Sequence, residues 1–191
     1  SPEKGSASLY GGAASFNYRL MPSGDAPPAY DFSLDLNNVN ISELLNDTVE
    51  EKNGRLALSG MLSSQLSVEG VAGRQEFRKG RLDIVLKNSQ ITSKNLISRI
   101  VSAVFSRQLA EKRIKTGLIS GYIIKDKLVI SDALIQLESL KLQGAGEMNL
   151  ENQKLDLSLQ VFMFEDETLR GKLLNTIGKL IAEVQVKGPL S

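Results

Sequence analysis

Apolar and polar residues alternate along much of this chain, most regularly near its C-terminal end. From Lys154 to Val161 every second residue is leucine or valine, and the residues between them are polar. A period of two is typical of a β-strand with one buried face. Upstream, Leu140 and Leu142 alternate with polar residues, and the polar segment Glu151–Gln153 lies between the two stretches. The pattern predicts an antiparallel hairpin.

The residues before this hairpin predict a second one. Leu118–Ile124 and Leu128–Leu137 lie on either side of a short polar turn. Ala133, Ile135 and Leu137 of the later strand occupy odd positions, whereas Leu140 and Leu142 occupy even ones. We therefore expect a β-bulge or a sharp bend near residues 138–139, and a curved antiparallel meander with one apolar face.

The N-terminal half contains weaker strand patterns separated by turn-forming residues. Strands are predicted over Leu9–Leu20 and Tyr30–Leu36, followed by a strand system over Arg55–Val71 and Arg81–Leu86. Met21–Ala29 contains three of the five prolines and is predicted to be a loop.

Three segments show helical signals. A short turn at Ser42–Leu45 would be capped by Asn40 or by Ser42 itself. Lys94–Arg113 is predicted to form a basic amphipathic helix, and Thr168–Ile181 a second helix weakened by two glycines. The apolar side of the first helix would pack on the sheet, or serve as a lid or a membrane-facing element. The apolar residues of this candidate lid are Leu96, Ile100, Val104 and Phe105.

A short internal similarity links two strands about fifty residues apart. Leu34, Leu36, Asn38 and Ile41 correspond to Ile84, Leu86, Asn88 and Ile91, and a helical signal follows each strand. A chance match and a repeated strand–strand–helix unit are both compatible with so short a pattern.

The composition excludes several classes of function. The chain of 191 residues has neither histidine nor cysteine, so it has no histidine base, thiolate nucleophile or thiolate zinc site. The only acidic clusters, at 50–51 and 165–167, lie between predicted elements. The net charge of +1 and the 5% of aromatic residues argue against a nucleic-acid partner. We expect a protein that is not an enzyme and binds no metal or cofactor.

A generic fold does not explain why so many of the predicted strands are apolar on one side. This face either packs beneath the predicted helices or stays partly open as a groove for acyl chains. The residues predicted to line it are Phe32, Leu34, Leu36, Leu82, Ile84, Leu86, Leu140, Leu142, Leu155, Leu157, Leu159, Val161 and Met163.

Four stretches resemble the AsmA-like family of bacterial envelope proteins, which is related to bridge-like lipid-transfer proteins. They are Leu9–Gly12, Asp35–Leu45, Leu140–Leu159 and Ala182–Ser191. The resemblance implies an open β-sheet groove with an apolar floor, standing in the periplasm and anchored to the inner membrane by a segment absent from this chain. Phospholipid or another acyl lipid would be the ligand, and other envelope proteins are further candidate partners.

These observations predict a single domain, residues 1–191, of the β-rich α+β class. Its strongly curved antiparallel sheet would have two amphipathic helices packed on or across its concave face. The predicted function is non-enzymatic accommodation or transfer of lipid in envelope biogenesis. The alternative is a structural or assembly module that docks another envelope protein through a sheet edge or an amphipathic helix.

Overall fold

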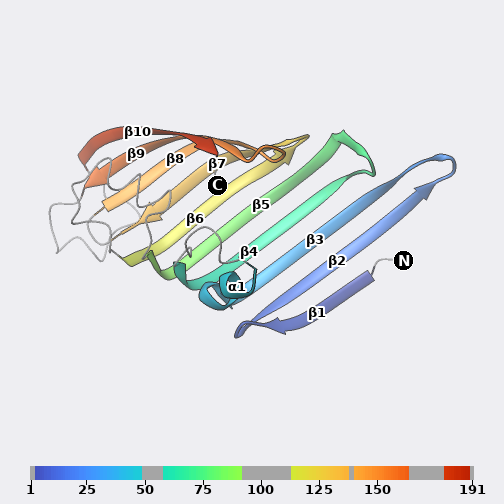
Figure 1. Cartoon of the computed structure of the whole chain (residues 1–191), viewed down its shortest axis with the longest axis horizontal. Coiled ribbons are helices and arrows are strands. Elements are labelled where there is room, and N and C mark those ends of the chain that lie inside the picture. The colour runs from blue at the N-terminus through green and yellow to red at the C-terminus, as the bar shows by residue number, and fades with distance from the viewer. Residues whose placement is uncertain (1–2, 49–57, 92–112, 138–139, 164–178, 190–191) are drawn as a thin grey trace.

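The alternating segments form consecutive strands of one antiparallel sheet. The computed structural model describes residues 3–48, 58–91, 113–137, 140–163 and 179–189, and their strands follow one another in the sheet in sequence order, from β1 to β10 (Figure 1). The elements are β1 (Glu3–Leu9), β2 (Gly12–Ser23), β3 (Ala26–Asn40), α1 (Ile41–Thr48), β4 (Leu58–Val71), β5 (Arg74–Ile91), β6 (Arg113–Ile124), β7 (Lys127–Gln136), β8 (Leu140–Asn149), β9 (Lys154–Met163) and β10 (Lys179–Pro189). Among the described strands β1 and β10 do not pair, so the sheet is open.

Both C-terminal hairpins predicted from the alternation are confirmed. Strand β6 pairs with β7 around Lys125 and Asp126, and β8 pairs with β9 around the polar turn at 150–153. The turn side chains contribute directly, since the Asn149 carboxamide oxygen accepts hydrogen bonds from the backbone N–H groups of Glu151 and Asn152. Such short-range hydrogen bonds explain why asparagine favours turns.

A change of frame that the sequence analysis did not predict lies inside β7. Ile130 pairs with Gly146 and Ala133 with Gly144, so two residues of β7 lie opposite the single residue Ala145. This bulge keeps the apolar residues on one face although their positions change from even to odd. The predicted bend at 138–139 lies outside the described residues, between two strands that run in opposite directions.

The predicted proline-rich loop at Met21–Ala29 is wrong. Strands β2 and β3 extend through it and leave only Gly24 and Asp25 as the connection, with Gly24 at a φ of 52°. Proline fits near this hairpin end because strand pairing is irregular between Met21 and Ser23.

The short helix expected after β3 is confirmed as α1. The Asn40 side-chain oxygen accepts a hydrogen bond from the Ser42 backbone N–H at 3.1 Å, and its amide donates to the Glu43 carboxylate at 2.9 Å. Asn40 is therefore the N-cap, and Glu43 adds a negative charge to the first turn, where the helix dipole favours it.

The predicted α+β class is wrong. The structure is nearly all antiparallel sheet, and α1 is the one helix among the described residues. Of the second predicted helix, residues 179–181 belong to β10, where Leu180 pairs with Phe162 and Ala182 with Val161. A short apolar run is compatible with the helical and with the strand period, and pairing with β9 makes this run a strand. The main parts of the two predicted helices, 94–112 and 168–178, lie outside the described residues.

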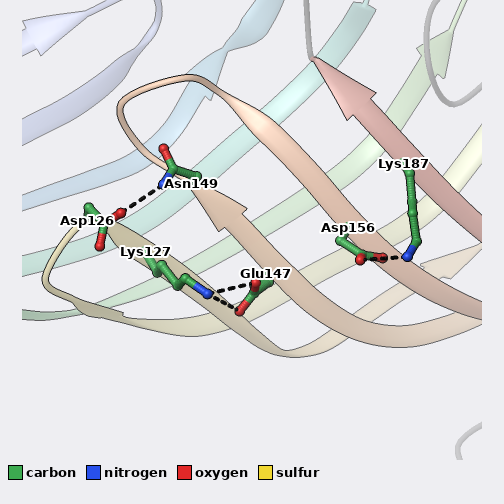
Figure 2. Close-up of polar contacts among 6 residues, drawn as sticks. All are labelled: Asp126, Lys127, Glu147, Asn149, Asp156 and Lys187. Carbon is green, nitrogen blue, oxygen red and sulfur yellow. Dashed lines mark hydrogen bonds and ion pairs between the residues drawn. The ribbon is translucent and has the colours of Figure 1, made fainter.

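Polar contacts on the face of the sheet opposite the apolar one join neighbouring hairpins (Figure 2). Lys127 of β7 contacts Glu147 of β8 at 2.9 Å, and Lys187 of β10 contacts Asp156 of β9 at 3.0 Å. The Asn149 amide donates a hydrogen bond to Asp126 in the β6–β7 turn at 2.8 Å. These side chains are exposed or half-exposed, so each ion pair contributes little to stability and mainly favours the register.

Candidate functional site

Strand register lines up the apolar side chains in rows that cross the whole sheet. Because side chains alternate between faces, residues paired directly across strands share a face. One row is Gly5, Phe16, Leu34, Leu66, Leu82, Gly121, Ile130, Gly146, Leu157 and Val186. The row on one side of it is Ala7, Ala14, Leu36, Ser64, Ile84, Ile119, Ala133, Gly144, Leu159 and Val184. The row on the other side is Glu3, Tyr18, Phe32, Val68, Gly80, Ile123, Leu128, Met148, Leu155 and Gly188.

We call the surface formed by these rows the apolar face. Glu3, in the first strand, is the one charged residue in the three rows, and Tyr18 and Ser64 each add a hydroxyl. With strands about 4.8 Å apart, each row follows the sheet for about 43 Å. The apolar face is therefore continuous from β1 to β10.

Residues on the opposite face are largely polar. One complete row there is Lys4, Asn17, Ser33, Ser67, Arg81, Tyr122, Val129, Glu147, Asp156 and Lys187. Polar side chains on this face are well hydrated, whereas exposure of the whole apolar face to water would be unfavourable, so part of it has to be buried.

Burial of the apolar face changes along the sheet. On β8 and β9 the side chains of Leu142 and Leu159 are each 2% exposed and belong to the main core cluster. On β2, Phe16 is 47%, Tyr18 37% and Leu20 46% exposed. The same face is thus closed core at the C-terminal strands and open surface at the N-terminal ones.

All thirteen residues predicted to line an acyl-chain groove lie on the apolar face. They do not share one environment, however. Leu140, Leu142, Leu155, Leu159 and Val161 are buried members of the core cluster. Leu82, Leu157 and Met163 are partly buried against it, and the other predicted residues of β3 and β5 are half-buried. Phe32, Leu34 and Leu36 of β3, with Ile84 and Leu86 of β5, are therefore the predicted residues that lie outside the core cluster.

The sequence analysis missed the most exposed part of this face. Phe16, Tyr18 and Leu20 alternate with the polar residues Asn17 and Arg19, which is the same period of two used elsewhere. The nearby glycines and the proline-rich segment weakened that signal, although both strands of this hairpin are long. Residues such as Leu66 and Val68 of β4 were missed because serines interrupt their alternation.

A polar depression of about 460 Å³ lies on the polar face over β3, β4 and β5. Its lining includes Ser33, Asp35, Gln65, Arg81 and Asp83. Arg81 contacts Asp83 at 2.7 Å, and together with the Ser120 hydroxyl, which donates to Asp83 at 2.7 Å, it holds the pKa of the Asp83 carboxyl below its usual value. Because both oxygens of the Asp83 carboxylate already accept hydrogen bonds, its role is to hold neighbouring strands together and not to transfer protons.

The predicted lid lies outside the described residues. The candidate lid residues Leu96, Ile100, Val104 and Phe105 fall in the segment 92–112, which is not described. Within the described ranges there is no group of three acidic side chains that could hold a metal ion. In that same part of the chain, no helix has the length and apolar character needed to cross a membrane.

Comparisons with known proteins found no match for this chain. No family model matches it, and no curated protein or solved structure is significantly similar to it. Membership of the AsmA-like family therefore stays a prediction that rests on the resemblance of the four sequence stretches alone.

Proposed function

We propose that this protein accommodates or transfers acyl lipid in the bacterial envelope without acting as an enzyme, with the acyl chains lying on the apolar face over β2–β5. The observation that carries the proposal is the exposure of Phe16 and Tyr18 near one end of rows that continue into the core, with Leu20 exposed beside them on the same strand. Large contiguous apolar surfaces on soluble proteins generally mark sites of interaction. The periplasmic location and the inner-membrane anchor belong to the same proposal and rest on the family resemblance.

The chemistry of the face suits acyl chains better than polar ligands. Phe32, Leu34 and Leu36 of β3 lie beside Val68 and Leu66 of β4, and this patch offers no charged group to a ligand. Each buried methylene contributes about 0.8 kcal/mol, so about ten of them approach the 8.2 kcal/mol of a micromolar complex before the cost of association. The headgroup of a lipid whose acyl chains lie on the apolar face would extend past the ends of the strands and stay in water.

The first test is mass spectrometry of organic extracts from the purified folded protein, with a denatured sample as the control. Phospholipid or fatty acid at near-stoichiometric amounts in the folded sample alone is the expected result. Background amounts in both samples, together with no uptake of a fluorescent fatty acid, would contradict the proposal and favour a module that docks other proteins.

A pair of variants on one strand locates the site. Phe16→Glu adds a carboxylate to the exposed end of the apolar face, whereas Ser15→Glu adds it to the polar face one residue away. Both positions are exposed, so neither variant is expected to unfold the sheet. Phe16→Glu should reduce uptake of the fluorescent fatty acid at least about tenfold, equal to about 1.4 kcal/mol, and Ser15→Glu should not. Equal uptake by both variants would place the lipid elsewhere.

A further inference from the structure

The two edge strands of the sheet differ in how they are protected from pairing with other chains. Strand β10 has the exposed charges of Glu183 and Lys187 along it, an irregular pairing between Leu180 and Ala182, and Pro189 at its end. Charges, bulges and proline are the devices that keep a sheet edge from adding another strand. The β10 edge is therefore protected.

Strand β1 has none of these devices after its second residue. It pairs with β2 through an unbroken register from Glu3 to Leu9, with no bulge and no proline. The residues Gly5–Leu9 are uncharged, and the first four of them are glycine, serine or alanine, with little steric bulk. A regular, uncharged edge with its backbone groups on the outer side is a template for strand addition.

Strand β1 is also complementary to itself. In an antiparallel pair of two β1 strands centred on Ser6, Glu3 lies opposite Leu9, Lys4 opposite Ser8, and Gly5 opposite Ala7. This register pairs all seven residues and places no like charges opposite each other. It also keeps Gly5 and Ala7 of both copies, which lie on the apolar face, on the same side of the joint, that is, of the paired β1 strands.

We propose that two copies of this chain associate through β1, antiparallel about Ser6, and form one continuous sheet with the apolar faces of both copies on the same side. The exposed Phe16 ring, which lies over Gly5 at this edge, would contact the second copy near its Ala7. The inference stands on the edge alone and does not depend on lipid binding. If both hold, the apolar surface open to a ligand is doubled.

The absence of cysteine makes disulfide trapping a clean test. Ser6→Cys places two thiols opposite each other at the centre of the joint, where paired Cα atoms about 4.5–5.5 Å apart suit a disulfide. Gln185→Cys on the exposed side of β10 is the matched control. Mild oxidation of the full chain should yield covalent dimer for Ser6→Cys and little for Gln185→Cys. Equal cross-linking of the two variants would overturn the proposal.

Charge exchange at the same position tests the joint without a covalent bond. Light scattering over a concentration series should give the wild-type chain a mass approaching twice 20.8 kDa. Ser6→Lys and Ser6→Glu should each weaken the dimer about fivefold through like charges at the centre, and mixing them should restore it. A wild-type monomer at every concentration, or a dimer that neither variant weakens, would overturn the proposal.

Discussion

Asn38 and Asn88, fifty residues apart, have the same left-handed backbone conformation, with φ angles of 55° and 51°. Each follows an apolar alternation and each precedes a residue with no exposed surface, Val39 in β3 and Ser89 in β5. Asparagine is one of the few residues other than glycine that tolerate this conformation. The shared geometry supports the internal similarity between the two strands.

Replacing Asn38 should separate backbone strain from side-chain packing. Asn37 and Asn38 together lie opposite Ser63, whose hydroxyl accepts a hydrogen bond from the Asn38 N–H at 3.1 Å. Asn38→Val should lower the free energy of unfolding by about 1–2 kcal/mol, because a β-branched residue is strained at positive φ. Asn38→Gly, which keeps the N–H and tolerates the conformation, should stay within about 0.5 kcal/mol of wild type. Urea unfolding measures both, and equal losses would contradict this account.

Leu157→Asp is expected to unfold the protein rather than report on lipid binding. Leu157 packs against the main core cluster, although it belongs to the same row of the apolar face as Phe16. A carboxylate at that position should cost more than about 3 kcal/mol of unfolding free energy. Phe16→Asp, at a side chain 47% exposed, should cost less than about 1 kcal/mol. Circular dichroism during thermal unfolding distinguishes the two, and a fully folded Leu157→Asp variant would show that the C-terminal part of the face is open.

Gly146 should not tolerate a side chain. A Cβ added there would collide with the Asp156 carbonyl oxygen and lie 2.8 Å from the Leu157 Cα, both backbone atoms of the neighbouring strand. Gly146→Ala should therefore lower the unfolding free energy by about 1–3 kcal/mol despite the better strand propensity of alanine. Ala145→Ser, on the exposed polar face beside it, is the control and should change stability little. A stabilised Gly146→Ala variant would mean that the two strands separate easily.

Asp83 should contribute to the acid sensitivity of the fold. Hydrogen bonds from Arg81 and Ser120 lower the pKa of the Asp83 carboxyl in the folded state, whereas the unfolded chain takes up this proton near pH 3.8. The stabilisation is thus complete above about pH 5 and is lost as the pH falls through the folded-state pKa. Asp83→Asn should reduce the loss of stability between neutral pH and pH 3, and by a small amount because the pair faces solvent. Identical acid-unfolding profiles for the two proteins would contradict this role.

The residues that alternate without interruption were enough to determine the C-terminal hairpins and their common apolar side. Leu155 to Val161 can satisfy one buried and one solvated face only as a strand, so no other part of the chain was needed. The cap of α1 was equally local, because Asn40 hydrogen-bonds to residues within three positions.

The tertiary structure decided the matters that depend on neighbouring strands. Met21 and Ala29 lie in a proline-containing segment that looks like a loop by itself, yet they pair with each other across a hairpin. Leu180 fits a helical or an extended pattern until Phe162 of β9 lies opposite it. Burial too is a collective property, since Phe16 and Leu157 share a row and an alternating pattern but only Leu157 packs against the core. Alternation specifies the face of a side chain, and the packing of the whole sheet specifies whether that face is covered.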